Sequence, residues 1–273
     1  MNSTEFKSYP NGAQSFGITG IVILGMILLS PVIVLLNYFL AKEPVILIYY
    51  ILAVGIPFWI VYSIRKSKTG DTSFNLKIEN KRIIPLVIIG TLALLFGIIS
   101  PVGELIPMPE SVKKMFYEFA GQNGIYAFIL LVIAAPVLEE LIFRGIILEG
   151  LLKNYSPLKS ILISSFLFGL VHLNPWQFFT GFFIGIFIGW IYYKTRSLTF
   201  PVIIHATANL TAYFTRAFID LETLIDKSSI EIFGGFTNYM IVIIGSIFIG
   251  SICLYFLMKE FRKERIVEKQ SIL

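Results

Sequence analysis

Residues 128–145 read FILLVIAAPVLEELIFRG and place three charged side chains within an otherwise apolar stretch. A transmembrane helix needs about 20 mainly apolar residues, and residues 124–150 satisfy that requirement. A charge at the centre of a bilayer costs about 2.5–3.5 kcal/mol on insertion scales. Glu139, Glu140 and Arg144 therefore need either partners or a function, and the rest of the sequence is searched for both.

The composition predicts a polytopic membrane protein. Hydrophobic residues make up 56% of the 273, charged residues only 14%, and the mean hydropathy is +0.81. Soluble domains contain roughly 45–50% apolar residues. We expect an all-α bundle of about eight transmembrane helices that forms a single integral membrane domain over residues 1–273. The eight predicted spans are residues 17–40, 44–64, 83–103, 124–150, 156–173, 176–194, 199–219 and 237–258.

The ends of the chain and its single cysteine add two expectations. The first apolar run is longer than the roughly 7–15 residues of a signal peptide's apolar region, so residues 17–40 are expected to be the first span. Cys253 is the one cysteine, which excludes an intramolecular disulfide.

The distribution of positive charge predicts the orientation. If the N-terminus is cytoplasmic, 16 of the 22 Lys and Arg residues lie on the cytoplasmic side, 5 lie outside, and Arg144 lies within a span. Cytoplasmic loops carry an excess of Lys and Arg. We therefore expect a multi-pass protein of the cell membrane with both termini cytoplasmic. The net charge of +5 then indicates contact with anionic lipids and no nucleic-acid partner.

Helical geometry gives the charges in residues 128–145 different surroundings. Glu140 and Arg144 are four residues apart and share a helix face, so they are predicted to form an ion pair. Glu139 lies about 100° around the helix and has no partner nearby in the sequence. Pro136 removes one backbone hydrogen bond and is predicted to kink the helix just before these residues.

The two histidines of the chain both fall within predicted spans. His172 follows Phe168 by one helical turn, and His205 precedes Asn209 by one turn, so each pair shares a face. One histidine in a membrane helix is more often a packing residue than a catalyst. Two of them, together with an unpaired Glu139, favour a polar site inside the membrane.

Three further patterns are interpreted structurally. Gly181, Gly185 and Gly189 recur every fourth residue and are predicted to let another helix approach closely. Residues 109–121 have the spacing of an amphipathic helix. Only Asn174 and Pro175 separate the fifth and sixth spans, which allows this hairpin to turn before it reaches the outer surface.

Three short motifs follow one another on successive predicted helices: Glu139-Glu140-x-x-x-Arg144, Phe168-x-x-x-His172 and His205-x-x-x-Asn209. In this order they resemble the motifs of the CPBP (Abi) intramembrane proteases. That family includes the type II CAAX prenyl endopeptidases and bacteriocin-immunity proteins. The resemblance covers roughly residues 124–219, which we expect to be the catalytic core.

The resemblance implies a role for each motif residue. Glu139 would be the general base and would activate a water molecule together with His172. His205 and Asn209 would stabilise the oxyanion of the tetrahedral intermediate. These roles suit amide hydrolysis, which needs an activated water and donors where negative charge develops. The other motif residues, Glu140, Arg144 and Phe168, would have supporting roles.

The same residues leave a metal mechanism open. Two histidines and a glutamate form a known zinc ligand set, with water in the fourth position. Asn209, an amide beside a histidine, suits an oxyanion better than a metal. A zinc site would also need acceptors to orient its histidines, and Glu140 is already assigned to Arg144. Metal-independent hydrolysis without a cofactor is therefore expected. If zinc is bound, its ligands are expected to be Glu139, His172 and His205.

These observations predict an intramembrane endopeptidase that cleaves a membrane protein or a lipid-embedded peptide. One alternative is a non-catalytic immunity or partner-binding protein of the same fold, in which motif residues could be replaced without loss of phenotype. Another is a transporter, which would favour broken helices in two repeated halves. Only one predicted span carries carboxylates and an arginine, which counts against transport.

Overall fold

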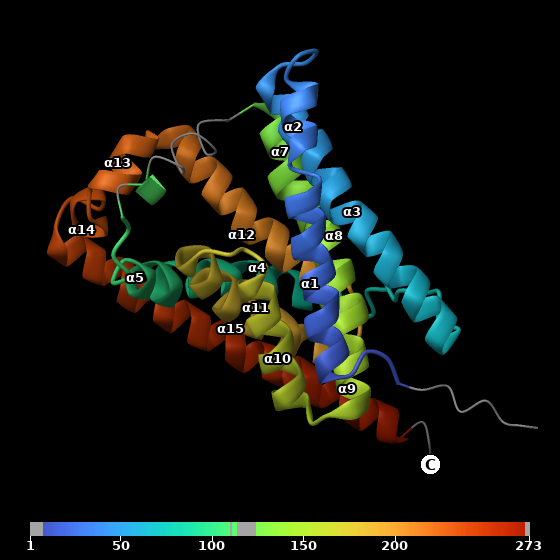
Figure 1. The fold of residues 1–273 in the computed structure, drawn as a ribbon. Helices are drawn as coiled ribbons and strands as arrows, with labels where there is room; N and C mark the ends of the chain where they lie inside the picture. The colour runs from blue at the N-terminus through green and yellow to red at the C-terminus, as the bar shows by residue number, and fades with distance from the viewer. Residues whose placement is uncertain (1–7, 110, 114–123, 271–273) are drawn as a thin grey trace, which may run out of the picture. The chain divides into compact units, whose positions relative to one another are not determined.

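The computed structural model describes residues 8–109, 111–113 and 124–270, and within these residues it contains helices and no strand (Figure 1). Helices suit a bilayer because each one satisfies its own backbone hydrogen bonds. The predicted all-α fold is confirmed. The chain divides into two units, Met1–Lys77 with Gln122–Ala206, and Ile78–Gly121 with Thr207–Leu273. The prediction of a single membrane domain with a core over residues 124–219 stays a prediction.

The first unit is built around one long helix, Ile125–Asn154, which contains two π-helical segments. In Figure 1 this helix is green, beside the blue α1 and the cyan α3. Helix α3 packs against α1 and α8, and α10 packs against α11 and η3. The elements of this unit are α1 (Gly12–Leu28), α2 (Pro31–Leu36), α3 (Lys42–Thr69), α7 (Ile125–Phe128), η2 (Ile129–Ala134), α8 (Ala135–Ile142), η3 (Phe143–Leu148), α9 (Glu149–Asn154), α10 (Pro157–Leu170), α11 (Pro175–Thr195) and the beginning of α12 (Thr199–Phe218).

The π-helical segments lie on both sides of the short helix that carries Glu139 and Glu140. Pro136 has no N–H to donate, and the predicted disturbance before it takes the form of the π-helical segment η2. The short helix α8 then carries Glu139 and Glu140, and η3 carries Arg144. A change from α- to π-helical winding rotates the side chains that follow. The sequence around Pro136 therefore sets the directions in which these charges point.

Helices α10 and α11 form a closely packed hairpin. A Cβ atom on Gly181, Gly185 or Gly189 would lie within 3.3 Å of an atom of α10, so the predicted close approach is confirmed. The side chain of Asn174 accepts a hydrogen bond from the backbone N–H of Gln177 and caps the start of α11. Helix α10 has only 14 residues and is about 21 Å long, shorter than the roughly 30 Å hydrocarbon core.

The second unit pairs its longest helix with a helix from the middle of the chain: α4 and η1 pack along α15. The backbone N–H of Ser229 donates to Oε1 of Glu104, 2.7 Å away, and ties α14 to the end of the α5 segment. The amphipathic helix predicted over residues 109–121 falls largely outside the described residues. The elements of this unit are α4 (Ile83–Leu94), η1 (Leu95–Ile99), α5 (Ser100–Gly103), the end of α12, α13 (Leu221–Asp226), α14 (Ser229–Ile232) and α15 (Phe236–Gln270).

The structure does not confirm the predicted count of eight membrane-spanning helices. Within the described residues, six helices are long and apolar enough to cross a membrane: Gly12–Leu36, Lys42–Thr69, Ile83–Gly103, Ile125–Asn154, Pro175–Thr195 and Phe236–Lys263. The other two predicted spans are helices, but α10 is short, and α12 carries polar side chains that include His205, Asn209 and Arg216. The protein is a multi-pass helical membrane protein, and the count of eight is not confirmed.

Candidate active site

The predicted ion pair lies at the centre of the first unit. Nη1 of Arg144 is 2.9 Å from Oε1 of Glu140, and both side chains have no exposed surface. Nη2 of Arg144 donates to the backbone carbonyl of Gly185 on α11, 3.3 Å away. The guanidinium carbon lies 4.4 Å from the centre of the Phe168 ring. Arg144 thereby connects Glu140 on α8 to Gly185 on α11 and to Phe168 on α10.

Glu140 also contacts a histidine, which the sequence did not reveal. Nδ1 of His205 lies 2.8 Å from the same Oε1 that accepts from Arg144. An ionised carboxylate only accepts hydrogen bonds, so Nδ1 carries the hydrogen and Nε2 is left for other partners. Nε2 lies 3.9 Å from Oε2 of Glu139. The view of Glu140 as a partner of Arg144 alone is therefore wrong, because Glu140 also orients the His205 ring.

Glu139 has a partner that lies far away in the sequence. The hydroxyl group of Tyr50, on α3, donates a hydrogen bond to Oε1 of Glu139. The other oxygen, Oε2, is buried and has no hydrogen-bond partner among the described residues. Sequence analysis missed Tyr50, which lies outside the three motifs. In the sequence, Tyr50 differs from its neighbours only by its hydroxyl group within an apolar span, a feature that many packing tyrosines share.

His172 joins the site through the Phe168 ring. Nδ1 of His172 lies 2.9 Å from the carbonyl oxygen of Phe168, which fixes the hydrogen on Nδ1 because a carbonyl cannot donate. The Phe168 ring packs edge-on against His172 and His205, with ring centres 5.4 and 5.5 Å away. Among the described residues, His172 makes no hydrogen bond to Glu139. The proposed cooperation of these two residues is therefore not visible as a direct contact.

The chain bends sharply just after His172. Leu173 has φ of +56°, a left-handed conformation that costs roughly 1–2 kcal/mol for a residue with a Cβ. Nδ2 of Asn174 donates to the carbonyl oxygen of His172, 2.9 Å away, while its Oδ1 caps α11. The turn that presents His172 is thus held by Asn174.

Asn209 lies on α12, four residues after His205, in the part of this helix that belongs to the second unit. Its predicted role as a second oxyanion donor stays a prediction.

Both histidines are oriented through Nδ1, which changes the argument about metal. His172 uses the Phe168 carbonyl, and His205 uses the Glu140 carboxylate. Acceptors of this kind typically orient histidines that bind a metal through Nε2. The earlier premise that such acceptors are lacking is therefore wrong. Within the described residues, however, no group of three or more His, Cys, Asp or Glu side chains is arranged to hold a metal ion. Metal-independent hydrolysis stays a prediction.

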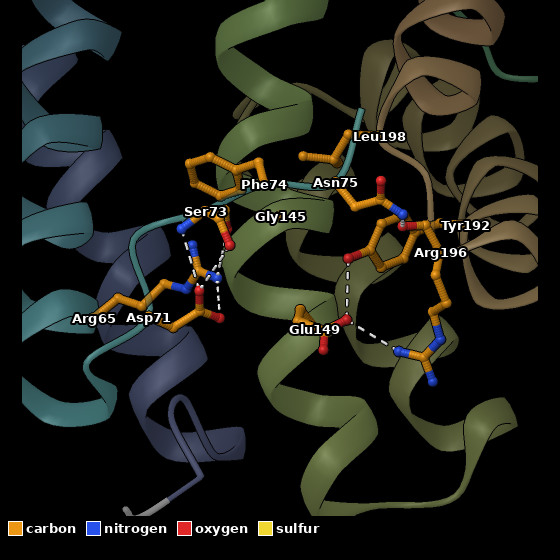
Figure 2. A pocket seen from close by; sticks show the side chains of 10 residues that line it. All are labelled: Arg65, Asp71, Ser73, Phe74, Asn75, Gly145, Glu149, Tyr192, Arg196 and Leu198. Carbon is orange, nitrogen blue, oxygen red and sulfur yellow. Dashed lines mark hydrogen bonds and ion pairs between the residues drawn. The ribbon is translucent and has the colours of Figure 1, made fainter. Parts of the chain in front are cut away.

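A second polar group, the helix-end cluster, surrounds a pocket of about 300 Å³ (Figure 2). We define the cluster by five residues: Arg65, Asp71, Glu149, Tyr192 and Arg196. Nη2 of Arg65 lies 2.6 Å from Asp71. Glu149 accepts from both Arg196 and Tyr192, each at 3.0 Å. Figure 2 shows these two sets on opposite sides of the pocket, with the segment from Ser73 to Asn75 between them.

The electrostatics of the helix-end cluster are those of a structural brace. Burial raises the pKa of Asp71, but the Ser73 N–H and the Arg65 guanidinium lower it by more, so the net pKa lies below the usual value. The backbone of Asn75 accepts from the N–H of Leu198 at 2.8 Å, and its side chain donates to the carbonyl of Arg196 at 3.0 Å. These bonds tie residues 70–77 to the connection between α11 and α12.

Comparisons with known proteins show what the chain is similar to. Residues 121–211 match the family model described as type II CAAX prenyl endopeptidase Rce1-like. A stretch of 77 residues is 32% identical to a protein of Bacillus subtilis (strain 168) named "Putative membrane peptidase YdiL", and covers 28% of this chain. The chain covers 32% of the length of that relative. No solved structure matches.

The fold and the buried acid–histidine centre define a multi-pass helical membrane protein with a polar site inside the bundle. The family-model match contains every motif residue from Glu139 to Asn209. The resemblance predicted from the motifs is confirmed over this segment: residues 121–211 are similar to the type II CAAX prenyl endopeptidases of the CPBP family.

Proposed function

We propose that this protein is an intramembrane endopeptidase that hydrolyses a peptide bond in a membrane protein or a lipid-embedded peptide. One observation carries the proposal: Glu139 has one oxygen held by Tyr50, while the other is buried, has no partner among the described residues and lies 3.9 Å from Nε2 of His205. A carboxylate oxygen in this setting is suited to accept a proton from water. The family match and the named relative support the same class of reaction.

The proposed mechanism begins at Oε2 of Glu139. This oxygen takes a proton from a water molecule, and the resulting hydroxide attacks the carbonyl carbon of the scissile bond. His172 exposes Nε2 as an acceptor because its hydrogen is on Nδ1, so it can orient the same water. When the carbon–nitrogen bond breaks, Glu139 passes the proton to the leaving amine. Glu139 thus acts first as a base and then as an acid.

The negative charge of the tetrahedral intermediate needs a donor. His205 can donate from Nε2 only when both ring nitrogens carry hydrogen, because Nδ1 already faces Glu140. The Glu140 carboxylate stabilises that doubly protonated ring. Asn209, one turn further along α12, is the proposed second donor. Preorganised donors of this kind are worth about 10²–10³-fold in rate each.

The test is a comparison of membrane proteins in cells that express the wild-type chain, Glu139→Gln or Glu149→Gln. Cleavage products with new termini should appear with the wild type and with Glu149→Gln, and disappear with Glu139→Gln. Equal product patterns in all three would overturn the proposal. A cellular phenotype that survives Glu139→Gln would instead favour a partner-binding immunity protein.

Metal independence is part of the proposal and needs its own test. Glu139, His172 and His205 are the residues that would bind zinc, but the described residues contain no three-ligand group, so no step is assigned to a metal. Purified protein should keep its activity after exhaustive chelation and contain no stoichiometric zinc. Activity lost on chelation and restored by zinc would replace this mechanism with a metal-dependent one.

We also propose that both termini are cytoplasmic, which places Ser67, near the end of α3, on the cytoplasmic side and Ser111 outside. In a Cys253→Ser background, an impermeant thiol reagent applied to intact cells should label Ser111→Cys and leave Ser67→Cys unlabelled. The reverse pattern would invert the topology.

A further inference from the structure

Two neighbouring tyrosines on α3 have hydroxyl groups with different partners. Tyr49 donates to the backbone carbonyl of Met26, 2.7 Å away, and so joins α3 to α1. Tyr50 donates to Oε1 of Glu139 on α8. Helix α3 packs against both α1 and α8, so each tyrosine bonds to the helix that it faces. Tyr50 lies outside residues 121–211, the segment that matches the family model.

We propose that Tyr50 is a positioning residue that holds Oε1 of Glu139, so that Oε2 is the oxygen that accepts the proton from water. The proposal rests on the proposed function and adds a residue from α3 to the site. It assigns different roles to the two oxygens of one carboxylate. It also predicts that Tyr50 acts through Glu139 and does not itself touch the reacting atoms.

The freedom of a glutamate side chain explains why such a residue is needed. The last torsion of glutamate, which turns the carboxylate, is broad and roughly two-fold, so the two oxygens exchange easily when neither is held. Glu139 cannot be held by Arg144, because that guanidinium is engaged by Glu140 on another face of the helix. The Tyr50 hydroxyl supplies a hydrogen bond to a charged acceptor, the stronger class of such bonds.

The charged and titratable groups around Glu139 come from three elements. His205, on α12, places Nε2 3.9 Å from Oε2. Glu140 and Arg144 follow on the same long helix, and the charge of Glu139 acts on Arg144. Tyr50 comes from α3 and binds the other oxygen. Without the Tyr50 hydroxyl, neither oxygen of Glu139 would accept a hydrogen bond from the described residues, so the carboxylate would be free to turn.

Dicyclohexylcarbodiimide is a probe for this effect that needs no substrate. It reacts with protonated carboxyl groups in apolar surroundings. The acid hydrogen moves to one carbodiimide nitrogen, the carboxyl oxygen bonds to the central carbon, and an acyl shift to nitrogen leaves a stable N-acylurea. Mass spectrometry of the modified peptide separates label on Glu139 from label on Glu140. The labelling rate of Glu139 at one fixed pH then reports how freely its carboxyl group can react.

The experiment compares full-length wild type, Tyr50→Phe and the matched control Tyr49→Phe in detergent. Tyr50→Phe should raise the rate of Glu139 labelling about tenfold at the same pH, because the hydrogen bond that holds the carboxyl group is lost. Tyr49→Phe loses a hydroxyl group from the same helix and should label like the wild type. Identical labelling rates for all three proteins would overturn the proposal. Incorporation of 3-fluorotyrosine at position 50, a more acidic donor, should slow the labelling of Glu139, and this variant tests the proposal if Tyr50→Phe does not fold.

An activity measurement separates this inference from the proposed function. With a substrate identified from cleavage products, Tyr50→Phe should lower kcat about tenfold with little change in KM. Glu139→Gln with full activity would defeat the proposed function and leave the labelling result standing. An inactive Glu139→Gln beside a wild-type kcat for Tyr50→Phe would defeat the positioning role alone.

Discussion

Two clusters in the first unit use the same parts. The candidate active-site cluster, called the active-site cluster below, consists of Tyr50, Glu139, Glu140, Arg144 and His205. In this cluster Arg144 pairs with Glu140 and stacks on Phe168 at 4.4 Å. In the helix-end cluster, Arg65 pairs with Asp71 and lies 4.7 Å from the centre of an aromatic ring. Each cluster also contains a tyrosine that donates to a second carboxylate. Residue types alone would therefore not tell the two clusters apart.

The difference lies in which atoms are left without partners. In the active-site cluster, three buried atoms lack a hydrogen bond within the described residues: Oε2 of Glu139, Oε2 of Glu140 and Nε of Arg144. Of these, Oε2 of Glu139 lies 3.9 Å from Nε2 of His205. In the helix-end cluster the atom without a partner is Nη1 of Arg65, a donor that cannot be deprotonated. A free carboxylate oxygen beside a histidine can accept a proton. A free guanidinium nitrogen beside a ring cannot, so the second cluster is a brace.

The largest effect on activity is expected when one carboxylate is removed from each cluster in turn. Glu139→Gln keeps the shape of the side chain and loses the base, so we expect activity to fall about 10²–10⁴-fold while the amount of folded protein stays near normal. Glu149→Gln should keep full activity. The measurement is turnover of an identified substrate by purified protein. A fully active Glu139→Gln, or an inactive and well-folded Glu149→Gln, would show that the roles have been assigned to the wrong cluster.

The next largest effect is expected on stability. Glu140→Gln removes the charge that balances Arg144 where neither side chain is exposed, and breaking a buried pair in this way costs about 3–5 kcal/mol. The variant should also lose activity, because His205 loses its charged acceptor. Thermal unfolding in detergent measures the first effect. The matched control is Asp71→Asn, whose partly exposed pair should cost about 1 kcal/mol or less. Equal losses in both variants would contradict the difference in burial.

The local part of the site could be predicted from the sequence. Glu140 and Arg144 are four residues apart, and helix geometry alone brings them together, as the 2.9 Å distance shows. Phe168 and His172 have the same spacing and are also in contact. Spacing along one helix fixes such contacts whatever the rest of the chain does. The all-α fold followed in the same way from composition and from the length of the apolar runs.

Contacts between helices could not be predicted. Tyr50 reaches Glu139 from a helix 89 residues earlier, and His205 reaches Glu140 from 65 residues later. No pattern in a single sequence states which faces of two helices meet. The span count of eight is not confirmed for a related reason: hydropathy locates α10, but its 14-residue length depends on where the turn at Leu173 and Asn174 forms.

A smaller effect is expected in the pH dependence of stability at Asp71. The folded-state pKa of Asp71 is lowered, so this group contributes stability that is present above its unfolded pKa, about 3.9, and is lost as pH falls through the folded value. The stability difference between wild type and Asp71→Asn should therefore shrink as pH falls from 7 to 3. Thermal unfolding of both proteins across this range measures it. A difference that grows at low pH would show that Asp71 is not held as a carboxylate.

The smallest effect is expected at Tyr192. Its hydroxyl donates to Glu149 at 3.0 Å, but Glu149 keeps Arg196 at 3.0 Å and Lys153 at 3.5 Å when that bond is lost. Tyr192→Phe should therefore cost about 0.5–1 kcal/mol, the low end for a single hydrogen bond, and leave turnover and its pH profile unchanged.

Tyr192→Phe is also the counterpart of Tyr50→Phe, because both remove a hydroxyl group that donates to a carboxylate on the same long helix. If a cluster is catalytic because one carboxylate oxygen is left free, only the loss of the Tyr50 hydroxyl group should change turnover. Glu149 is instead surrounded by cations, so its carboxylate is already committed to ion pairs. Kinetics and thermal unfolding of both variants, measured side by side, decide this. A fall in turnover with Tyr192→Phe at unchanged stability would show that the helix-end cluster takes part in the reaction.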